Sequence, residues 1–202
     1  MSEINAGNRQ NDRPRVLVAE DEALIRLDLV ELLTTEGYDI IKQVGDGEAA
    51  VAAARELEPD LVLMDIKMPK MTGIEAARII ASERIAPVVI LTAFSQRDLV
   101  EQARDAGAMA YVVKPFDASD LVPAIEIAMA RFTELRDIED EVNDLEERLE
   151  SRKTIDQAKG ILQETLDLSE PEAFRWIQKT AMDLRKSMRE VAAGVIDHAK
   201  NK

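Results

Sequence analysis

The chain has 202 residues, a net charge of -14 and a hydrophobic content of 46%. This length suits one full domain and a smaller second one, and the acidity argues against a generally basic nucleic-acid coat. The sequence has no cysteine, which excludes disulfides and thiol catalysis, and no apolar run approaches the roughly 20 residues that cross a bilayer.

The N-terminal segment, residues 1–14, is polar and lacks the apolar core of a signal peptide. We therefore expect a flexible N-terminus and a cytoplasmic protein. The lack of cysteine fits a reducing compartment as well. The first ordered element is expected to begin at residue 15.

Short apolar runs and helical patterns alternate from residue 15 to residue 131. Strands are predicted near 15–19, 39–43, 60–65, 87–91 and 110–113, and helices near 22–36, 46–57, 73–82, 95–107 and from 118 onward. Gly37 and Gly107 follow two of these helices, at positions where a left-handed residue is favoured. The alternation predicts an α/β domain with a doubly wound, five-stranded parallel sheet and helices on both faces.

Reactive side chains follow four of the predicted strands. Glu20 and Asp21 follow the first, Asp65 ends the third, Thr92 follows the fourth, and Lys114 follows the fifth. Because the carboxyl ends of parallel strands share one edge, these side chains should meet in one crevice where the strand order reverses. A single acidic residue there is more often a helix N-cap, so the combination carries the prediction.

The predicted crevice has the chemistry of a phosphorylation site. Three neighbouring carboxylates repel one another unless a cation joins them, and oxygen ligands suit Mg²⁺ better than zinc, for which only His198 is available. Asp65 can attack a phosphoryl group as a carboxylate nucleophile. Lys114 would supply positive charge and Thr92 a hydroxyl donor to the phosphoryl oxygens.

Five motifs in this region match a known family in order and spacing. They are Val-Leu-Val-Ala-Glu20-Asp21-Glu, Leu-Val-Leu-Met-Asp65-Ile-Lys-Met-Pro69, the following Gly73, Val-Ile-Leu-Thr92-Ala93 and Tyr111-Val-Val-Lys114-Pro115-Phe116. Residues 15–131 therefore resemble the flavodoxin-like receiver domain of bacterial two-component response regulators.

The resemblance to receiver domains implies a role for each matching residue. Asp65 would be the phosphoacceptor for a sensor histidine kinase, and Lys114, before a cis Pro115, would hold the phosphate. Thr92 and Tyr111 would form the switch pair. The Mg²⁺ ligands would be Glu20, Asp21, Asp65 and the backbone carbonyl of Lys67. Glu20 replaces the commoner Asp, so its longer arm would reach the metal through water or a shifted geometry.

A different period begins after residue 130. Leu135, Ile138, Val142, Leu145 and Leu149 recur at steps of three and four between acidic residues, and no Gly or Pro occurs between Ala124 and Lys159. This pattern predicts one long helix with a coiled-coil linker at residues 132–150. The linker is either a spacer that packs on its own chain or the seam of a homodimer, whose formation would depend on phosphorylation.

The tail, residues 151–202, has 10 basic and 8 acidic residues, whereas residues 131–150 have 3 and 9. Two capping-box patterns, Ser169–Glu172 and Ser187–Glu190, predict helices at about 170–183 and 188–199, after the long helix ends near residue 163. The tail is therefore predicted to be a small three-helix all-α domain. Its expected core is Ile155, Ala158, Ile161, Leu162, Ala173, Ile177, Ala181, Met182, Val191, Ala192 and Val195.

The tail also resembles a known family, the ANTAR domain, an RNA-binding antitermination module. The matching segments are Ile155–Leu162, Ser169–Phe174, Ala181-Met182 and Val191-Ala192. The order of the two domains is similar to that in actinobacterial phosphorylation-dependent transcriptional antitermination regulators. This resemblance implies binding to paired RNA stem-loops with hexanucleotide loops and regulation of transcription termination.

Polar and basic residues of the tail are the candidate RNA contacts. Lys159 is the strongest candidate, because Ala158 and Gly160 beside it are small enough to let a ligand backbone approach. The others are Arg152, Lys153, Gln157, Gly160, Arg175, Lys179, Arg185, Lys186 and Arg189. Phe174 is expected in the core, and either Trp176 or Ile177 is expected to point partly outward.

Two other classes of function compete with an RNA-binding regulator. A receiver-controlled DNA-binding regulator would need a helix-turn-helix, but residues 164–169 are long for its turn. An aspartyl-phosphate phosphatase would be expected to place an acid-base carboxylate two residues after Asp65, where this chain has Lys67. The chain is therefore expected to be a regulator and not an enzyme.

Overall fold

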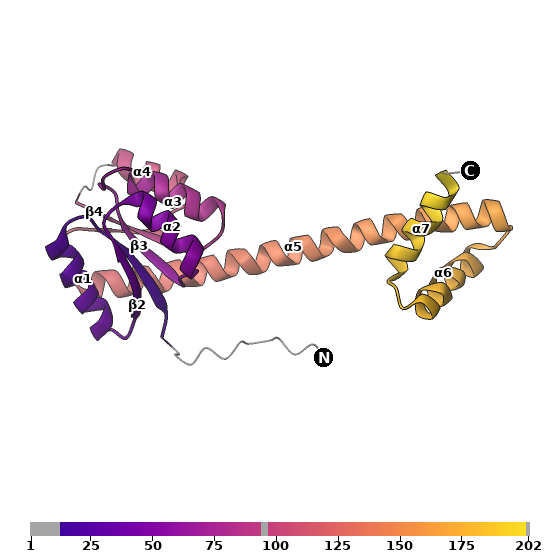
Figure 1. Cartoon of the computed structure of the whole chain (residues 1–202), viewed down its shortest axis with the longest axis horizontal. Helices are drawn as coiled ribbons and strands as arrows, with labels where there is room; N and C mark the ends of the chain where they lie inside the picture. Colours follow the sequence, from indigo (N-terminus) through magenta and orange to yellow (C-terminus); the bar gives the residue numbers. More distant parts are fainter. Residues whose placement is uncertain (1–12, 94–96, 201–202) are drawn as a thin grey trace. The chain divides into compact units, whose positions relative to one another are not determined.

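The computed structural model describes residues 13–93 and 97–200. The predicted flexible N-terminus, residues 1–14, lies almost entirely outside the described residues. The chain divides into two compact units, Met1–Leu135 and Arg136–Lys202, and each unit is considered by itself (Figure 1).

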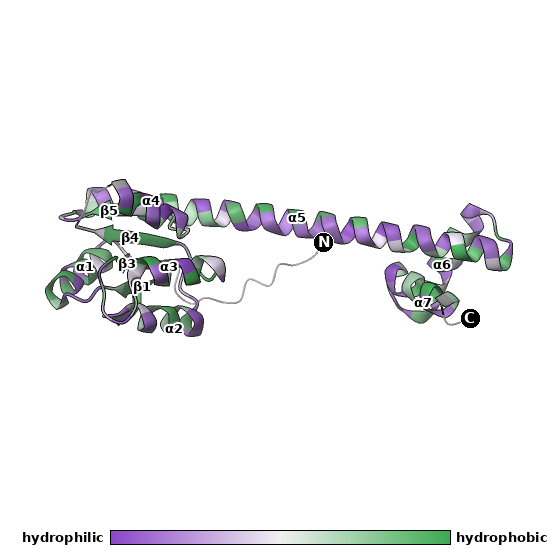
Figure 2. Ribbon diagram, turned by 90° about the horizontal axis from the view of Figure 1, so that it is seen from above, coloured by the Kyte–Doolittle hydropathy of each residue, from purple (hydrophilic) through white to green (hydrophobic). Residues whose placement is uncertain are grey.

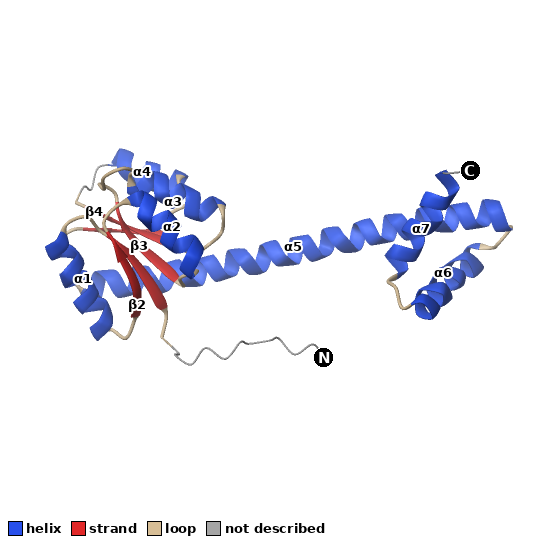
Figure 3. Ribbon diagram, in the orientation of Figure 1, coloured by secondary structure: helices blue, strands red, loops and turns tan. Residues whose placement is uncertain are grey.

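The first unit is built on a five-stranded parallel sheet (Figure 3). Its strands are β1 (Arg15–Ala19), β2 (Asp39–Val44), β3 (Leu61–Asp65), β4 (Val88–Thr92) and β5 (Ala110–Val113). The strand order is β2-β1-β3-β4-β5, so the order reverses between β1 and β3. The predicted doubly wound sheet is confirmed, and its switch point lies beside the ends of the strands that carry the acidic residues.

Helices cover both faces of the sheet. They are α1 (Ala23–Thr35), α2 (Gly47–Leu57), α3 (Gly73–Ser82), α4 (Arg97–Asp105) and the first part of α5 (Ala118–Leu166). Residues of α2, α3 and α4 form one buried cluster with the sheet, and residues of α1 and α5 form the other. Every residue of β3 and β4 is buried, as expected for central strands covered on both faces.

The predicted helix-ending glycines are confirmed. Gly37 has a φ of 92° and Gly107 a φ of 86°, in the left-handed region where a Cβ atom is disfavoured. At Gly107 an added Cβ would also lie 2.7 Å from the Cβ of Ala81. These two glycines therefore end α1 and α4 and direct the chain into the following strands.

The second unit contains the later part of α5, then α6 (Glu170–Leu184) and α7 (Met188–Lys200). Both predicted capping boxes form, since Glu172 accepts hydrogen bonds from Ser169 and Glu190 accepts them from Ser187. The buried residues that hold the three helices together are Ala158, Leu162, Ala173, Ile177, Ala181, Val191, Ala192 and Ile196.

The prediction that Met182 belongs to the tail core is wrong. Met182 is 75% exposed, because it lies outside the buried stripe of α6 that runs through Ala173, Ile177 and Ala181. Ile196 of α7, which the sequence pattern did not select, is buried instead. The three-helix arrangement itself is confirmed.

The middle of α5 is exposed in the part of the chain that the structure describes. Along this 49-residue helix, hydrophilic and hydrophobic residues alternate (Figure 2), and nearly all side chains from residue 133 to residue 150 are exposed. The apolar seam residues are between 47% and 58% exposed; they are Leu135, Ile138, Val142, Leu145 and Leu149. The seam does not pack on the described part of its own chain.

Among the described helices, none is both long enough and apolar enough to cross a membrane.

Candidate functional site

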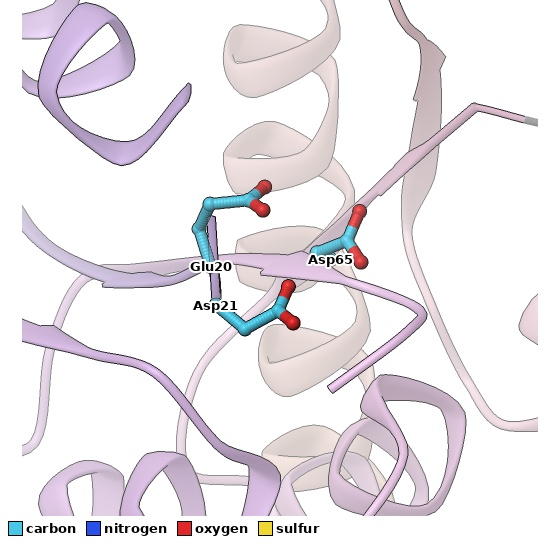
Figure 4. Close-up of side chains that lie close together, drawn as sticks. All are labelled: Glu20, Asp21 and Asp65. Atoms are coloured by element: carbon cyan, nitrogen blue, oxygen red, sulfur yellow. The ribbon is translucent and has the colours of Figure 1, made fainter. Parts of the chain in front are cut away.

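Three carboxylates meet at the carboxyl edge of the sheet (Figure 4). Glu20 and Asp21 follow β1, and Asp65 is the last residue of β3. One carboxylate oxygen from each residue lies within 4.8 Å of the others. The convergence predicted from the strand ends is therefore present in the structure.

Lys114 links two of these carboxylates. Its Nζ atom donates to Glu20 Oε2 at 2.6 Å and to Asp65 Oδ1 at 2.5 Å, across 94 and 49 residues of sequence. Asp65 Oδ2 accepts a hydrogen bond of 2.7 Å from the backbone N–H of Lys67. The backbone N–H of Lys114 donates to the carbonyl of Thr92 at 2.7 Å, which joins the ends of β4 and β5.

Burial governs the electrostatics of the lysine bridge. Burial raises the pKa of the Glu20 carboxyl group, and this effect is larger than that of the hydrogen bond from Lys114, which lowers the pKa. The negative charge of Asp65 raises the pKa of Glu20 further. Burial alone would lower the pKa of Lys114, but the hydrogen bonds and charges of Asp65 and Glu20 outweigh it and raise that pKa. The ammonium group thus stays charged, yet it does not fully compensate the buried Glu20 carboxylate.

The residues present fit a hard divalent cation. The donor set is composed of three carboxylate oxygens that lie within 4.8 Å of one another. Such a set matches the oxygen ligands that Mg²⁺ takes in proteins. Glu20 is 0% exposed, whereas Asp21 is exposed, so Asp21 is the more accessible of the two acidic residues after β1.

A cavity of about 700 Å³ opens onto this edge of the sheet. Its polar lining includes Asp21, Asp65, Lys67, Thr92 and Lys114, and α1 supplies an apolar wall. A small phosphorylated molecule could therefore reach Asp65 from solvent. Tyr111 is not part of this lining: its side chain is exposed and lies beside a different cavity, next to α4 and α5.

A close backbone contact holds Asp65 against the start of α3. A Cβ atom added to Gly73 would lie 1.9 Å from the carbonyl oxygen of Asp65, and the backbone N–H of Gly73 donates to the carbonyl of Ile66 at 2.9 Å. Only a residue without a side chain lets the loop after β3 turn back this tightly. Gly73 therefore fixes the position of Asp65.

Arg26 contributes to the site without having been predicted. Its Nη1 atom donates to the backbone carbonyl of Glu20, so α1 holds the loop that carries the acidic pair. In the sequence, an arginine on an amphipathic helix is normally part of the solvated face. No periodic or motif signal distinguished Arg26 from such a residue.

The candidate RNA contacts of the second unit are spread over three helices. Lys153 and Gln157 are exposed on α5, Arg175 and Lys179 on α6, and Arg189 on α7. Arg185 and Lys186 lie in the connection after α6, where Arg185 has a φ of 53°. Lys153 pairs with Glu150 at 2.8 Å, and Arg189 lies 3.6 Å from Glu147.

Lys159 has a more enclosed position than the other candidates. Its side chain is only 15% exposed, and its Nζ atom lies 2.8 Å from both Asp156 Oδ1 and Glu170 Oε1. Ala158 is fully buried in the tail core, so its small size serves helix packing. Gly160 has open space beside it, since an added Cβ would meet nothing within 4 Å.

The two aromatic residues of α6 are both partly exposed. Phe174, which was predicted to be in the core, is 42% exposed, so that prediction is wrong. The physical reason is that the buried stripe of α6 runs through Ala173, Ile177 and Ala181 and leaves Phe174 at its margin. Trp176 is 39% exposed while Ile177 is buried, as expected for one outward-pointing residue of that pair.

Comparison with known proteins identifies two family matches. Residues 16–126 match the response regulator receiver domain, and residues 143–196 match the ANTAR domain. The transcriptional regulatory protein PdtaR of Mycobacterium tuberculosis is 61% identical over 183 residues, which cover 91% of this chain and 89% of that protein.

Other similar proteins match a smaller share of the chain. The chemotaxis protein CheY of Thermotoga maritima is 38% identical over 112 residues, covering 55% of this chain and 93% of CheY. Among solved structures, the receiver domain of the response regulator NarL from Mycobacterium tuberculosis superposes with a TM-score of 0.56 and 27% identity. That match covers 58% of this chain and 97% of the NarL domain.

Proposed function

The chain belongs to the response regulators, with a receiver domain followed by an ANTAR domain, and from this we propose that phosphorylation of Asp65 controls its binding to RNA. It is a regulator of gene expression that acts through RNA binding and transcription antitermination. The proposed partners are a sensor histidine kinase and RNA stem-loops with hexanucleotide loops. The proposed domain limits are residues 15–131 for the receiver, 132–150 for the linker and 151–202 for the RNA-binding domain.

The observation that carries the proposal is the convergence of Asp65, two further carboxylates and Lys114 beside a solvent-open cavity. In the proposed reaction a carboxylate oxygen of Asp65 attacks the phosphorus atom and the bond to the donor's leaving group breaks. Phosphoryl transfer of this kind depends mainly on positioning and charge neutralisation. Lys114 neutralises the phosphoryl oxygens and Thr92 donates a hydrogen bond to one of them.

The proposed Mg²⁺ ligands are Glu20, Asp21, Asp65 and the Lys67 carbonyl. When bound, the cation would neutralise phosphoryl charge that the three carboxylates would otherwise repel. Glu20 is held by Lys114 and by the backbone N–H of Glu22 at 3.3 Å, so its carboxylate is oriented in advance. Arg26 keeps the backbone of the same loop in place.

Lys114 should be required for signalling more than for phosphorylation. We expect Lys114→Ala to accept phosphate from acetyl phosphate but to lose the phosphorylation-dependent gain in RNA affinity, because the ammonium couples the phosphate to the end of β4. Phosphorylation measured by intact mass and RNA affinity measured by fluorescence anisotropy would separate the two effects. A matched control is Lys70→Ala, which removes an exposed lysine that forms a salt bridge with Asp46, outside the cluster of three carboxylates. Normal activation of Lys114→Ala would contradict this role.

The exposed seam of α5 is a surface through which two RNA-binding domains could be brought together. Five apolar side chains face solvent on a helix that runs through both units. We propose that two copies of the chain associate along this seam when the receiver is phosphorylated. The acidic residues beside the seam oppose association of the resting form.

The function is tested directly by sequencing the nucleic acid that copurifies with the phosphorylated protein, with RNA and DNA scored separately. Enrichment of RNA hairpins is the expected result. Enrichment of duplex DNA would favour a DNA-binding regulator instead. No observation on the second unit favours that alternative, since residues 143–196 match the ANTAR domain.

A further inference from the structure

The second unit contains a groove between α5 and α6 whose chemistry suits a nucleotide. Its volume is about 440 Å³, within the roughly 300–1,000 Å³ typical of small-molecule sites. Arg148, Arg152 and Lys159 line it from α5, and Phe174 lines it from α6. The groove thus places an aromatic ring among three basic side chains.

The ring of Phe174 lies at the margin of the folded core and is not part of its buried cluster. It is 42% exposed, although phenylalanine is among the residues most often fully buried. Ile155 provides further apolar lining in the same groove. An exposed aromatic ring over an apolar base is the arrangement on which proteins stack an unpaired nucleobase.

The three basic residues of the groove differ in the salt bridges that they form within the protein. Lys159 is held by Asp156 and Glu170, each at 2.8 Å, and Arg148 pairs with Asp144 at 2.7 Å in an exposed contact. Arg152 makes no salt bridge among residues 13–93 and 97–200 and is exposed. Its charge contributes to lowering the pKa of Asp156, after the larger effect of the hydrogen bond from Lys159.

The ion pairs of Lys159 also prepare the groove for an anion. They neutralise the acid that lines the groove, Asp156, and they connect α5 to the first residue of α6, four positions before Phe174. A phosphate entering the groove therefore meets the charge of Arg152 without strong repulsion. An exposed ion pair such as Arg148–Asp144 is weak because solvent screens it, so Arg148 can exchange its partner for a phosphate.

We propose that this groove binds one unpaired nucleotide of an RNA loop, with the base stacked on Phe174 and the adjacent phosphate held by Arg152. Lys159 is a positioning residue that fixes α6, and with it Phe174, against α5. The inference rests on the proposed RNA-binding function. It goes beyond that function in naming the subsite, the stacking residue and the part of the RNA that is bound.

The test uses the full-length phosphorylated protein and a hairpin RNA that the wild type selects from a pool with randomised hexanucleotide loops. Failure of the wild type to select any hairpin would overturn the proposed function itself. If a hairpin is selected, Phe174→Leu should weaken its binding by roughly 5- to 150-fold, the range for stacking of one base, while the salt dependence stays unchanged. Phe174→Tyr should retain affinity within a few-fold, and Trp176→Leu, which removes an aromatic ring elsewhere on α6, should have little effect.

Arg152→Gln should behave differently from the aromatic variant. Loss of one phosphate contact should lower the slope of log affinity against log salt by about 0.7. Arg136→Gln removes the same charge from an earlier part of α5 and should leave the slope unchanged. Lys159→Gln should weaken binding without changing the slope; a decrease of about 0.7 would instead make Lys159 a direct phosphate contact and overturn its positioning role.

A double-mutant cycle separates stacking from a general structural effect. Abasic nucleotides are placed at each loop position in turn and tested against the wild type and Phe174→Leu, with folding of each variant checked by circular dichroism. At one loop position the abasic change should weaken wild-type binding but add little to the loss in Phe174→Leu, because both remove the same contact. Additive losses at every position, or equal losses for a fully paired RNA duplex, would overturn the proposal.

Discussion

Replacing Asp65 with Asn should abolish Mg²⁺-dependent phosphorylation by acetyl phosphate. The amide keeps the shape of the side chain, and its single oxygen can still accept a hydrogen bond from either Lys114 or the N–H of Lys67, but the substitution removes the nucleophilic carboxylate. We expect the phosphorylated fraction, measured by intact mass, to fall to background. Addition of EDTA to the wild type should have the same effect, because it would remove the proposed Mg²⁺ from the carboxylate cluster.

Two controls make the Asp65→Asn experiment specific. Asp28→Asn changes another carboxylate that lines the same cavity from α1 but is outside the cluster of three, and it should be phosphorylated normally. A thermal melt of Asp65→Asn should show a folded protein. Robust phosphorylation of the Asn variant would show that the acceptor is a different residue.

Changing both Leu145 and Leu149 to Asp should remove the effect of phosphorylation on binding to an RNA with two stem-loops. If paired tails bind paired loops, joining them should strengthen binding by a factor of order 10² to 10⁴ without a new contact. Two carboxylates in the seam would prevent that association, whereas affinity for a single stem-loop should barely change. Anisotropy with one-loop and two-loop RNAs, together with mass from light scattering, would measure both effects.

The matched control for the seam adds the same two charges elsewhere on α5. Thr133→Asp with Asn143→Asp places them off the apolar seam, on exposed positions of the same helix. This variant should keep the phosphorylation-dependent gain. If phosphorylation of the wild type raises affinity equally for one loop, with no change in mass, the seam is a spacer and control operates within one chain.

The sheet and the acidic cluster could be predicted because their signals are local. Each strand is an apolar run followed by a reactive residue, and parallel topology then brings the ends of the strands together. The bridge from Lys114 to Glu20 could not be predicted, since its 2.6 Å contact depends on the longer arm of Glu20 and on burial. Arg26 was missed because its contact is to a backbone carbonyl, which leaves no residue pattern.

The tail was predicted less completely than the sheet. Its capping boxes locate helix starts to within a residue, but helix position does not determine which side chains are covered. The buried stripe of α6 is narrow, so a step of one position along the helix separates the exposed Phe174 and Met182 from the buried Ala173 and Ala181. Residue-type burial tendencies cannot resolve a difference of that size.

The exposed middle of α5 has a consequence for how that helix moves. Between residues 133 and 150 nearly all of its side chains are exposed in the described part of the chain, and helices in proteins owe most of their stability to tertiary packing of an apolar face. Its backbone amides should therefore open and exchange with solvent deuterium faster than those of the covered helices α2 and α3. Association along the seam would slow that exchange. The exchange rates of the amides of residues 133–150 would therefore report whether a second chain is bound.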